Sequence, residues 1–184
     1  GFSSRQREFN SPWGHHICSR LKFQPYFRQM GGFNKKTVRD INLSGKRVLL
    51  RVDYNVPVKD NHVVDDYRIR QSLPTIEYIL SQKPAALIII SHLGRPEGKR
   101  DADFSLLPVV KRLSQLLGQP VCFAMDCIGP QAKAAGKITL LENLRFHSGE
   151  EKNEGGFAKE IVEASGADIF VQDGFGVVHR EHAR

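Results

Sequence analysis

Polar and charged side chains follow several apolar, strand-like runs of this 184-residue chain at the point where each run ends. Arginine guanidinium groups match the geometry of phosphate and carboxylate, and histidine adds a further hydrogen-bond donor. Aspartate and asparagine can accept a hydrogen bond from a ligand hydroxyl group. Together these residue types predict a site for a small, multiply charged anion that carries a hydroxyl. The residues are Asp53, Asn55, His92, Arg95, Glu142, Asn143, Arg145 and Asp173.

Two further arginines come from loops that we expect to lie beside these strand ends. Arg68 opens the first helix, and Arg180 follows the last strand. Each residue taken singly has a structural explanation. A loop arginine is usually a solvated charge, Asp53 can cap a turn, Tyr54 can serve packing alone, and Glu142 can pair with a neighbouring arginine. The same placement at four strand ends favours a shared anion site over these separate explanations.

The hydrophobic pattern that must position these residues alternates between strands and helices from Lys46 onward. Such alternation favours βαβ units with right-handed crossovers. We therefore expect an α/β fold, doubly wound and Rossmann-like, with a mainly parallel sheet, helices on both faces and all strand ends at one edge. Ser105 is expected to cap the second helix and Gly118 to end it. The expected strands are 47–52, 86–91, 120–125, 137–143 and 167–172, and the expected helices are 69–80, 106–117, 129–135 and 156–165.

Charge and composition limit the classes of partner. The net charge of +7 includes +4 from residues 1–34, where five arginines and lysines face one acid, so the rest of the chain is only mildly basic. Nucleic-acid binding is therefore a weak hypothesis, and it would rest on residues 1–34. No apolar run approaches the roughly 20 residues of a membrane helix. Three cysteines without a CxxC pair indicate reduced thiols, so we expect a soluble, cytoplasmic protein.

Several familiar motifs are missing from the sequence. No GxGxxG follows a strand and no GxxxxGK[ST] occurs, so neither a dinucleotide nor a P-loop nucleotide site has a local signature. The stretch that begins with Asp173 and Gly174 resembles a protein-kinase DFG motif only superficially, because glycine stands where that motif has phenylalanine. A metal site at His15, His16 and Cys18 is a weak hypothesis, since nothing around these residues predicts structure.

Residues 1–34 differ from the rest of the chain in composition. They are rich in arginine and nearly free of acids, and they show no sustained helical or strand period. We interpret them as a basic N-terminal extension, either a transit peptide that would address an organelle or a non-native leader ahead of a start at Met30. The folded domain is expected to occupy residues 35–184.

Five motifs in this order, "RVDYNVP", "DDYRIRQSLPTIEY", "SHLGRP", "LLENLRF" and "DGFGVVHR", resemble the N-terminal domain of phosphoglycerate kinases. The resemblance runs from about residue 35 to residue 184. It implies a two-domain kinase that moves a phosphoryl group between 1,3-bisphosphoglycerate and ADP, or from MgATP to 3-phosphoglycerate. It also implies that this chain supplies the half that binds 3-phosphoglycerate, and that the full-length protein is a monomer.

The same resemblance assigns roles to residues of this chain. It implies that Arg68 stabilises the transferring phosphoryl group and is the catalytic residue. The other implied substrate-binding residues are Asp53, Tyr54 and Asn55 at the hydroxyl and carboxyl end, His92, Leu93, Gly94 and Arg95 after the second strand, and Arg145 and Arg180 in a basic cradle for the 3-phosphate.

The resemblance also implies what this chain alone would lack. In the family a C-terminal domain binds the co-substrate MgATP or MgADP, and we expect that domain to be absent here and these residues alone to be inactive. Gly174 and the "VVHR" stretch depart from the family pattern of alanine and "TAHR". The alternative hypothesis is a non-catalytic binding or assembly module that kept the fold, with the basic extension as its attachment to a partner.

Overall fold

The computed structural model describes residues 36–150, 152 and 154–174 of the chain. The chain divides into two units, residues Gly1–Lys36 and Thr37–Arg184, and every element described below belongs to the second. The expected leader at residues 1–34, with its His15, His16 and Cys18, lies outside the described residues.

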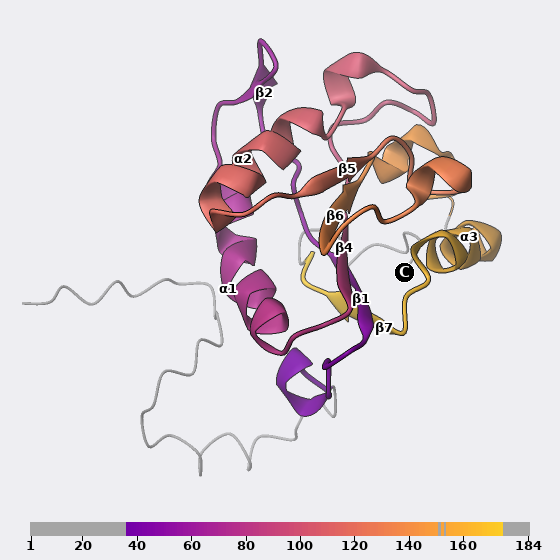
Figure 1. The fold of residues 1–184 in the computed structure, drawn as a ribbon. Helices are drawn as coiled ribbons and strands as arrows, with labels where there is room; N and C mark the ends of the chain where they lie inside the picture. Colours follow the sequence, from indigo (N-terminus) through magenta and orange to yellow (C-terminus); the bar gives the residue numbers. More distant parts are fainter. Residues whose placement is uncertain (1–35, 151, 153, 175–184) are drawn as a thin grey trace, which may run out of the picture. The chain divides into compact units, whose positions relative to one another are not determined.

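The centre of the second unit is a five-stranded sheet in the order β5-β6-β4-β1-β7, with every neighbouring pair parallel (Figure 1). Each expected strand is present, one to three residues shorter than predicted. All five residues of β4 are buried, as its unbroken apolar sequence requires for a strand covered on both faces. The strands are β1 (Arg47–Arg51), β4 (Ala86–Ile90), β5 (Cys122–Ala124), β6 (Ile138–Leu141) and β7 (Ile169–Gln172), and β2 (Val58–Lys59) pairs with β3 (His62–Val63) in a separate antiparallel hairpin.

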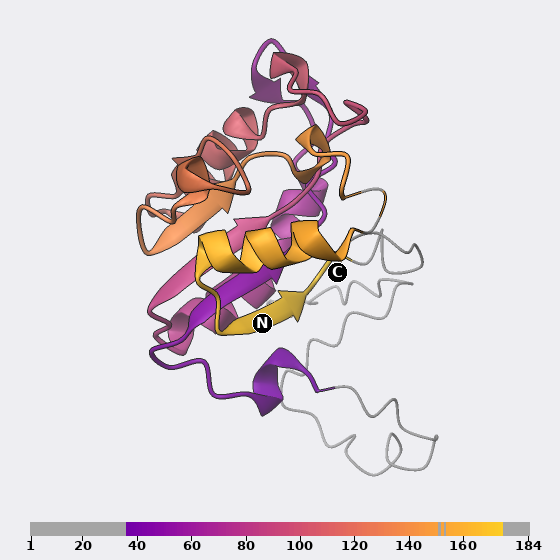
Figure 2. The ribbon, with the colours of Figure 1, turned by 90° about the vertical axis from the view of Figure 1, so that its right-hand side faces the viewer.

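Helices cover both faces of the sheet, which confirms the doubly wound α/β prediction (Figure 2). Helices α1 (Tyr67–Ser81) and α2 (Leu107–Leu117) pack on one face, and α3 (Gly155–Ser165) packs on the other. Successive side chains of β1 alternate between the two cores, with Leu50 in the first and Leu49 in the second. None of the described helices is long and apolar enough to cross a membrane.

Short 3-10 helices occupy the connections: η1 (Val38–Asp40), η2 (Ala102–Phe104), η3 (Pro130–Ala132) and η4 (Leu144–Phe146). The helix predicted at 129–135 is therefore wrong in type, because only the single turn η3 forms there. Pro130 suits the first position of such a turn, where its missing N–H has no intrahelical partner to lose.

The connections that follow β4 and β6 lie on opposite faces of the sheet. The chain leaves β4 toward α2 on one face and leaves β6 toward α3 on the other. Since β4 and β6 are neighbours, the connections part between their carboxyl ends. Open α/β sheets bind ligands in the crevice at such a switch point. The fold thus places the loops that follow Ile90 and Leu141 where a ligand is expected.

The start of α2 is held differently from the prediction. Helix α2 begins at Leu107, and the carboxylate of Glu142 accepts hydrogen bonds from the Leu106 N–H at 2.8 Å and from the Ser105 hydroxyl at 2.9 Å. Among the described residues Glu142 therefore pairs with a helix start and not with an arginine, and Ser105 accepts the Leu107 N–H only at a long distance of 3.3 Å. The predicted end is confirmed, because Gly118 has a left-handed φ of 64°.

Glu142→Met tests this cap. The substitution removes the acceptor for two buried N–H groups, those of Leu106 and Asn143, because the same Oε1 atom accepts both. We expect the free energy of unfolding to fall by about 2–3 kcal/mol, measured by urea denaturation. Glu160→Met on the exposed surface of α3 is the matched control and is expected to change it by less than about 0.5 kcal/mol. Equal losses in the two variants would contradict the capping role.

Candidate functional site

The carboxyl edge of the sheet brings together most of the predicted site residues. Asp53 and Asn55 follow β1, and His92 to Arg95 follow β4. Arg145 lies in η4 after β6. Arg68 reaches the same edge from the first turn of α1. Arg180 lies outside the described residues, so its placement stays a prediction.

Asp53 and Arg68 form an ion pair at the outer surface of this edge. The Arg68 side chain is 49% exposed, while that of Asp53 is 15% exposed. The other Asp53 oxygen accepts the Asn55 N–H at 3.1 Å, so the turn-capping interpretation of Asp53 is also correct. The Asp53 carboxylate therefore caps the turn in which it lies and also pairs with the Arg68 guanidinium, which faces solvent.

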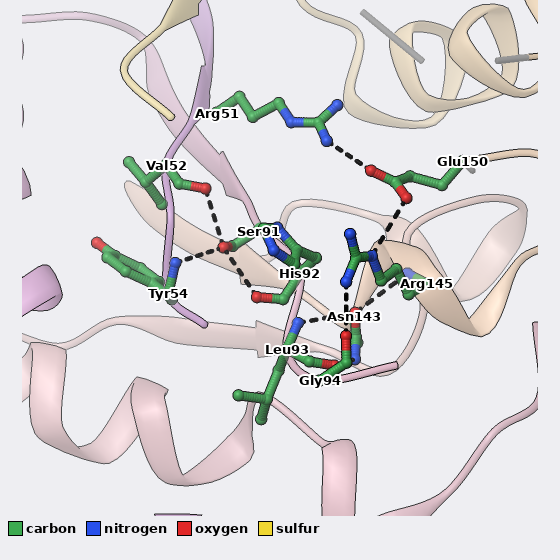
Figure 3. A network of polar contacts seen from close by, with 10 residues as sticks. All are labelled: Arg51, Val52, Tyr54, Ser91, His92, Leu93, Gly94, Asn143, Arg145 and Glu150. Atoms are coloured by element: carbon green, nitrogen blue, oxygen red, sulfur yellow. Dashed lines mark hydrogen bonds and ion pairs between the residues drawn. The ribbon is translucent and has the colours of Figure 1, made fainter. Parts of the chain in front are cut away.

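Gly94 connects the loops that follow three strands. Its N–H donates to Asn55 Oδ1 at 2.9 Å, and its carbonyl accepts from a terminal nitrogen of Arg145 at 2.7 Å (Figure 3 shows the second contact). The residue has a φ of 61°, and a β-carbon there would overlap the ring of Phe104. Glycine is required at this position by its backbone angle and by Phe104, both of which are internal to the fold.

Asn143 joins the ends of β4 and β6 across the switch point. Its Oδ1 accepts the Leu93 N–H at 3.2 Å, and its amide nitrogen donates to the Leu93 carbonyl at 2.7 Å and the Phe104 carbonyl at 2.9 Å. Both backbone polar groups of Leu93 are thus bonded within the chain, and its side chain is buried. The substrate-binding role of Leu93 and Gly94 stays a prediction; in this structure their N–H groups donate to Asn143 and Asn55.

The substrate-binding role implied for Tyr54 stays a prediction, whereas the packing role considered for its side chain is confirmed. It is completely buried, and its hydroxyl hydrogen-bonds to the Ser72 hydroxyl at 2.8 Å. Burial raises the pKa of this phenol above its usual range. Its N–H donates to Ser91 Oγ at 2.8 Å, and Ser91 in turn donates to the Val52 carbonyl at 2.9 Å (Figure 3). Tyr54 and Ser91 therefore fix the loop that carries Asp53.

A buried ionic cluster that the sequence analysis missed lies behind the edge. Glu150 is fully buried, and its carboxylate forms ion pairs with Arg51 at 2.6 Å and with Arg145 at 3.5 Å (Figure 3). Both arginines are 5% exposed or less. A glutamate in the stretch "SGEEKNE" gives no local sign of burial, because its neighbours are charged, small or polar. Arg145 is thus a cation beneath the surface, oriented by a carboxylate and by the Gly94 carbonyl.

His92, in the loop after β4, is 4% exposed. Burial, and next the positive charge of Arg145, lower the pKa of His92 to about 4. Its Nδ1 atom has no hydrogen-bond partner among the described residues. The imidazole is therefore neutral near pH 7, so His92 contributes a hydrogen-bonding group to the site and no charge.

The edge as a whole has an exposed cationic layer over a rigid support. Arg68 and Arg95 are exposed, and Arg95 makes no hydrogen bond or ion pair with any residue that the structure describes. Asn55 is exposed beside them. Two accessible guanidinium groups with nearby hydrogen-bonding side chains suit a small phosphate or carboxylate compound. A hollow of about 560 Å³ lies elsewhere, between the β2–β3 hairpin and helices α1 and α2.

Comparison with known proteins gives a consistent result. The family described as "Phosphoglycerate kinase" matches residues 38–184. The phosphoglycerate kinase of Pelotomaculum thermopropionicum is 52% identical over 155 residues, and that of Borrelia hermsii is 50% identical over 154. These matches cover 81% and 80% of this chain but only 39% and 38% of the relatives. The chain thus spans less than two-fifths of the length of the relatives it matches.

Solved structures agree with the sequence matches. Phosphoglycerate kinase from Coxiella burnetii aligns with a TM-score of 0.71 at 40% identity, covering 80% of this chain and 37% of that one. The enzyme from Pyrococcus horikoshii aligns with a TM-score of 0.69 at 30% identity, covering 80% of this chain and 38% of that one.

Gly94→Ala tests the packing requirement at the loop junction. Alanine must adopt a left-handed φ and displace the Phe104 ring, so we expect the unfolding free energy to fall by about 2 kcal/mol or more. Gly118→Ala is the matched control, because it has a similar φ of 64° with open space around the β-carbon, and it is expected to cost only about 1 kcal/mol. Chemical denaturation of both variants measures the difference, and equal costs would contradict the role of Phe104.

The depressed pKa of His92 predicts acid sensitivity. Between about pH 4 and pH 6.5 the unfolded chain binds a proton at His92 that the folded chain does not, so stability falls as the pH is lowered through this window. His92→Gln is expected to reduce the slope of unfolding free energy against pH there by up to about 1.4 kcal/mol per pH unit. Urea denaturation at several pH values measures the slope. An unchanged slope would show that His92 titrates alike in both states.

Proposed function

Because this chain belongs to the phosphoglycerate kinase family, we propose that it supplies the 3-phosphoglycerate-binding half of a kinase. That kinase moves a phosphoryl group between 1,3-bisphosphoglycerate and ADP, or from MgATP to 3-phosphoglycerate. The observation that carries the proposal is the family match over residues 38–184, which includes every residue of the cationic edge described above. The open edge, with accessible arginines, is also chemically suited to a small phosphorylated acid.

In this proposal the substrate binds over the exposed layer of the edge. Arg95 and Arg180 bind the 3-phosphate, with Arg95 well suited because it is exposed and unpaired among the described residues. Asn55 and Asp53 contact the hydroxyl and carboxyl end of the glycerate. Arg145 and His92 contribute from beneath, Arg145 through its charge and its bond to the Gly94 carbonyl.

Arg68 is the proposed catalytic residue. Phosphoryl transfer needs little covalent chemistry from the protein, so an arginine that neutralises the charge of the transferring group can contribute a factor of roughly 10³ or more. Asp53 holds the Arg68 guanidinium at the edge and partly neutralises it. An arriving phosphoryl oxygen competes with Asp53 for that guanidinium, so the ion pair keeps Arg68 in place until substrate binds.

The nucleotide co-substrate is proposed to bind to another domain of the kinase. The relatives are more than twice as long as the region matched here, and this sequence has no glycine-rich nucleotide motif. We assign MgATP and MgADP binding to a domain of the kinase outside residues 1–184. The two halves would close over the transferring group and exclude water. These 184 residues alone are then expected to bind the acid and to show no turnover.

We propose the remaining assignments on the resemblance of the five sequence motifs. Residues 35–184, of which the family match covers residues 38–184, form the N-terminal domain of the kinase, and residues 1–34 form an extension ahead of it. The partners are small-molecule substrates, without a membrane or a nucleic acid. The full-length kinase is a cytoplasmic monomer, and an organelle is its location if residues 1–34 are a transit peptide.

Titration of 3-phosphoglycerate into the 184-residue chain, followed by calorimetry, tests the proposal. We expect saturable binding, and we expect Arg95→Ala to weaken it at least roughly tenfold because a charge-assisted contact is lost. Arg39→Ala is the matched control, since this exposed arginine precedes β1 in η1 and stacks on Tyr78. It is expected to leave the affinity unchanged.

The outcomes separate the two hypotheses of function. Binding that Arg95→Ala weakens and Arg39→Ala does not would identify the edge as an acid site. A chain that is folded by circular dichroism yet binds no 3-phosphoglycerate would contradict the proposal and favour the non-catalytic module. Equal weakening by both variants would mean that binding depends on net charge and not on this edge.

A further inference from the structure

Three potential metal ligands gather at the far end of the same sheet edge, outside the residues assigned to the proposed function. Asp126 and Cys127 follow the edge strand β5, and His147 follows η4 after β6. One carboxylate oxygen, the thiol sulfur and one imidazole nitrogen all lie within 4.8 Å of one another. The sequence brings these residues together only through the fold, because His147 is 20 positions from Cys127.

We propose that Asp126, Cys127 and His147 bind a borderline or soft divalent metal ion of the Zn²⁺ class. Thiolate, imidazole and carboxylate are the ligands that zinc combines in protein sites. Thiolate excludes Mg²⁺ and Ca²⁺ as the preferred ions, since these take oxygen ligands. The proposal does not depend on the kinase assignment.

The distances fit such a site with a small adjustment. Metal–ligand bonds of about 2.0–2.3 Å place ligand atoms roughly 3–4 Å apart around a four-coordinate ion. Here Asp126 Oδ1 and His147 Nε2 are hydrogen-bonded at 2.7 Å, so the imidazole already points its nitrogen at the carboxylate. A metal ion would take the place of the shared proton. The imidazole proton then moves to Nδ1, and the thiol of Cys127 releases its proton on forming the metal–sulfur bond.

The surroundings hold these ligands in place and leave one side open. Cys127 is fully buried, whereas the side chains of Asp126 and His147 are 23% and 28% exposed. A buried cysteine is usually an inert apolar residue, but this one borders two polar ligands on the solvent side. Solvent can therefore reach the cluster and supply a fourth ligand.

Neighbouring residues orient the ligands from outside. Arg100 donates to the Met125 carbonyl at 2.6 Å and to Asp126 Oδ2 at 3.3 Å. Asp126 Oδ1 accepts the Cys127 N–H at 2.7 Å and also faces His147 Nε2. The ring of His147 lies 5.6 Å from that of Phe157 in α3. Partners of this kind fix carboxylate and imidazole ligands in metal sites.

Cobalt titration of the 184-residue chain tests the site. All proteins carry Cys18→Ser, because Cys18 lies beside His15 and His16 outside the described residues and could bind metal separately. We expect a thiolate-to-cobalt charge-transfer band in the near ultraviolet that saturates at about one equivalent. Zn²⁺ is expected to displace the cobalt and abolish the band, and excess Mg²⁺ is expected not to.

Variants assign the band to these ligands. Cys127→Ser is expected to abolish it, while Cys122→Ser, the matched control in β5, is expected to retain it. His147→Gln, at a partly exposed position where folding is less at risk, is expected to weaken cobalt binding at least roughly tenfold. Circular dichroism verifies the fold of each variant.

Three results would overturn the proposal. They are no thiolate band at saturating cobalt, a band that survives Cys127→Ser, and an affinity that His147→Gln leaves unchanged. Displacement of cobalt by Mg²⁺ at equal concentration would overturn the assignment to a soft or borderline ion.

Discussion

A parallel sheet that binds ligands at its carboxyl edge has loops there whose backbone N–H and C=O groups need hydrogen-bond partners. Those partners must not cover the edge where the ligand binds. In this chain three buried polar side chains meet that requirement. Asn143 bonds the loop after β4, Ser91 bonds the loop after β1, and Glu142 bonds the start of α2. Because these bonds lie beneath the surface, the outer side of the edge stays open for Arg68 and Arg95. Rigidity and access are thus provided by different layers of residues.

The placement of charge follows the same division. Exposed arginines lose little by facing water, and their charge is available to a ligand. The buried arginines Arg51 and Arg145 need a counter-charge, which Glu150 supplies to both. The same carboxylate therefore holds both buried guanidinium groups in place beneath the loop of Gly94.

The fold was predictable because its signals are local. The apolar, β-branched run 86–90 favoured a strand covered on both faces, and a glycine at 118 after the helical period favoured the end of α2, as the structure has them. The gathering of Asp53, Asn55, Arg68 and Gly94 followed from the rule that parallel strand ends share an edge. These predictions needed only residue type, periodicity and topology.

The supporting layer could not be predicted, because its partners are distant in sequence. Arg51 and Glu150 are 99 positions apart, and neither local stretch indicates that the other exists. The family resemblance implies a substrate-binding role for Tyr54, yet strand-like alternation carries its ring into the core toward Ser72. The sequence pattern identifies which loops meet, whereas the side chains that join them depend on three-dimensional packing.

The two hydrogen bonds of the Gly94 backbone have a mechanical consequence. The Gly94 N–H is bonded to the loop after β1 and the Gly94 carbonyl to the loop after β6, so a displacement of one loop is transmitted to the other through the backbone of a single residue. The loops after β1, β4 and β6 are therefore mechanically coupled for as long as both hydrogen bonds hold. Ordering of Asn55 by any ligand also reduces the motion of Arg145, which no ligand need touch.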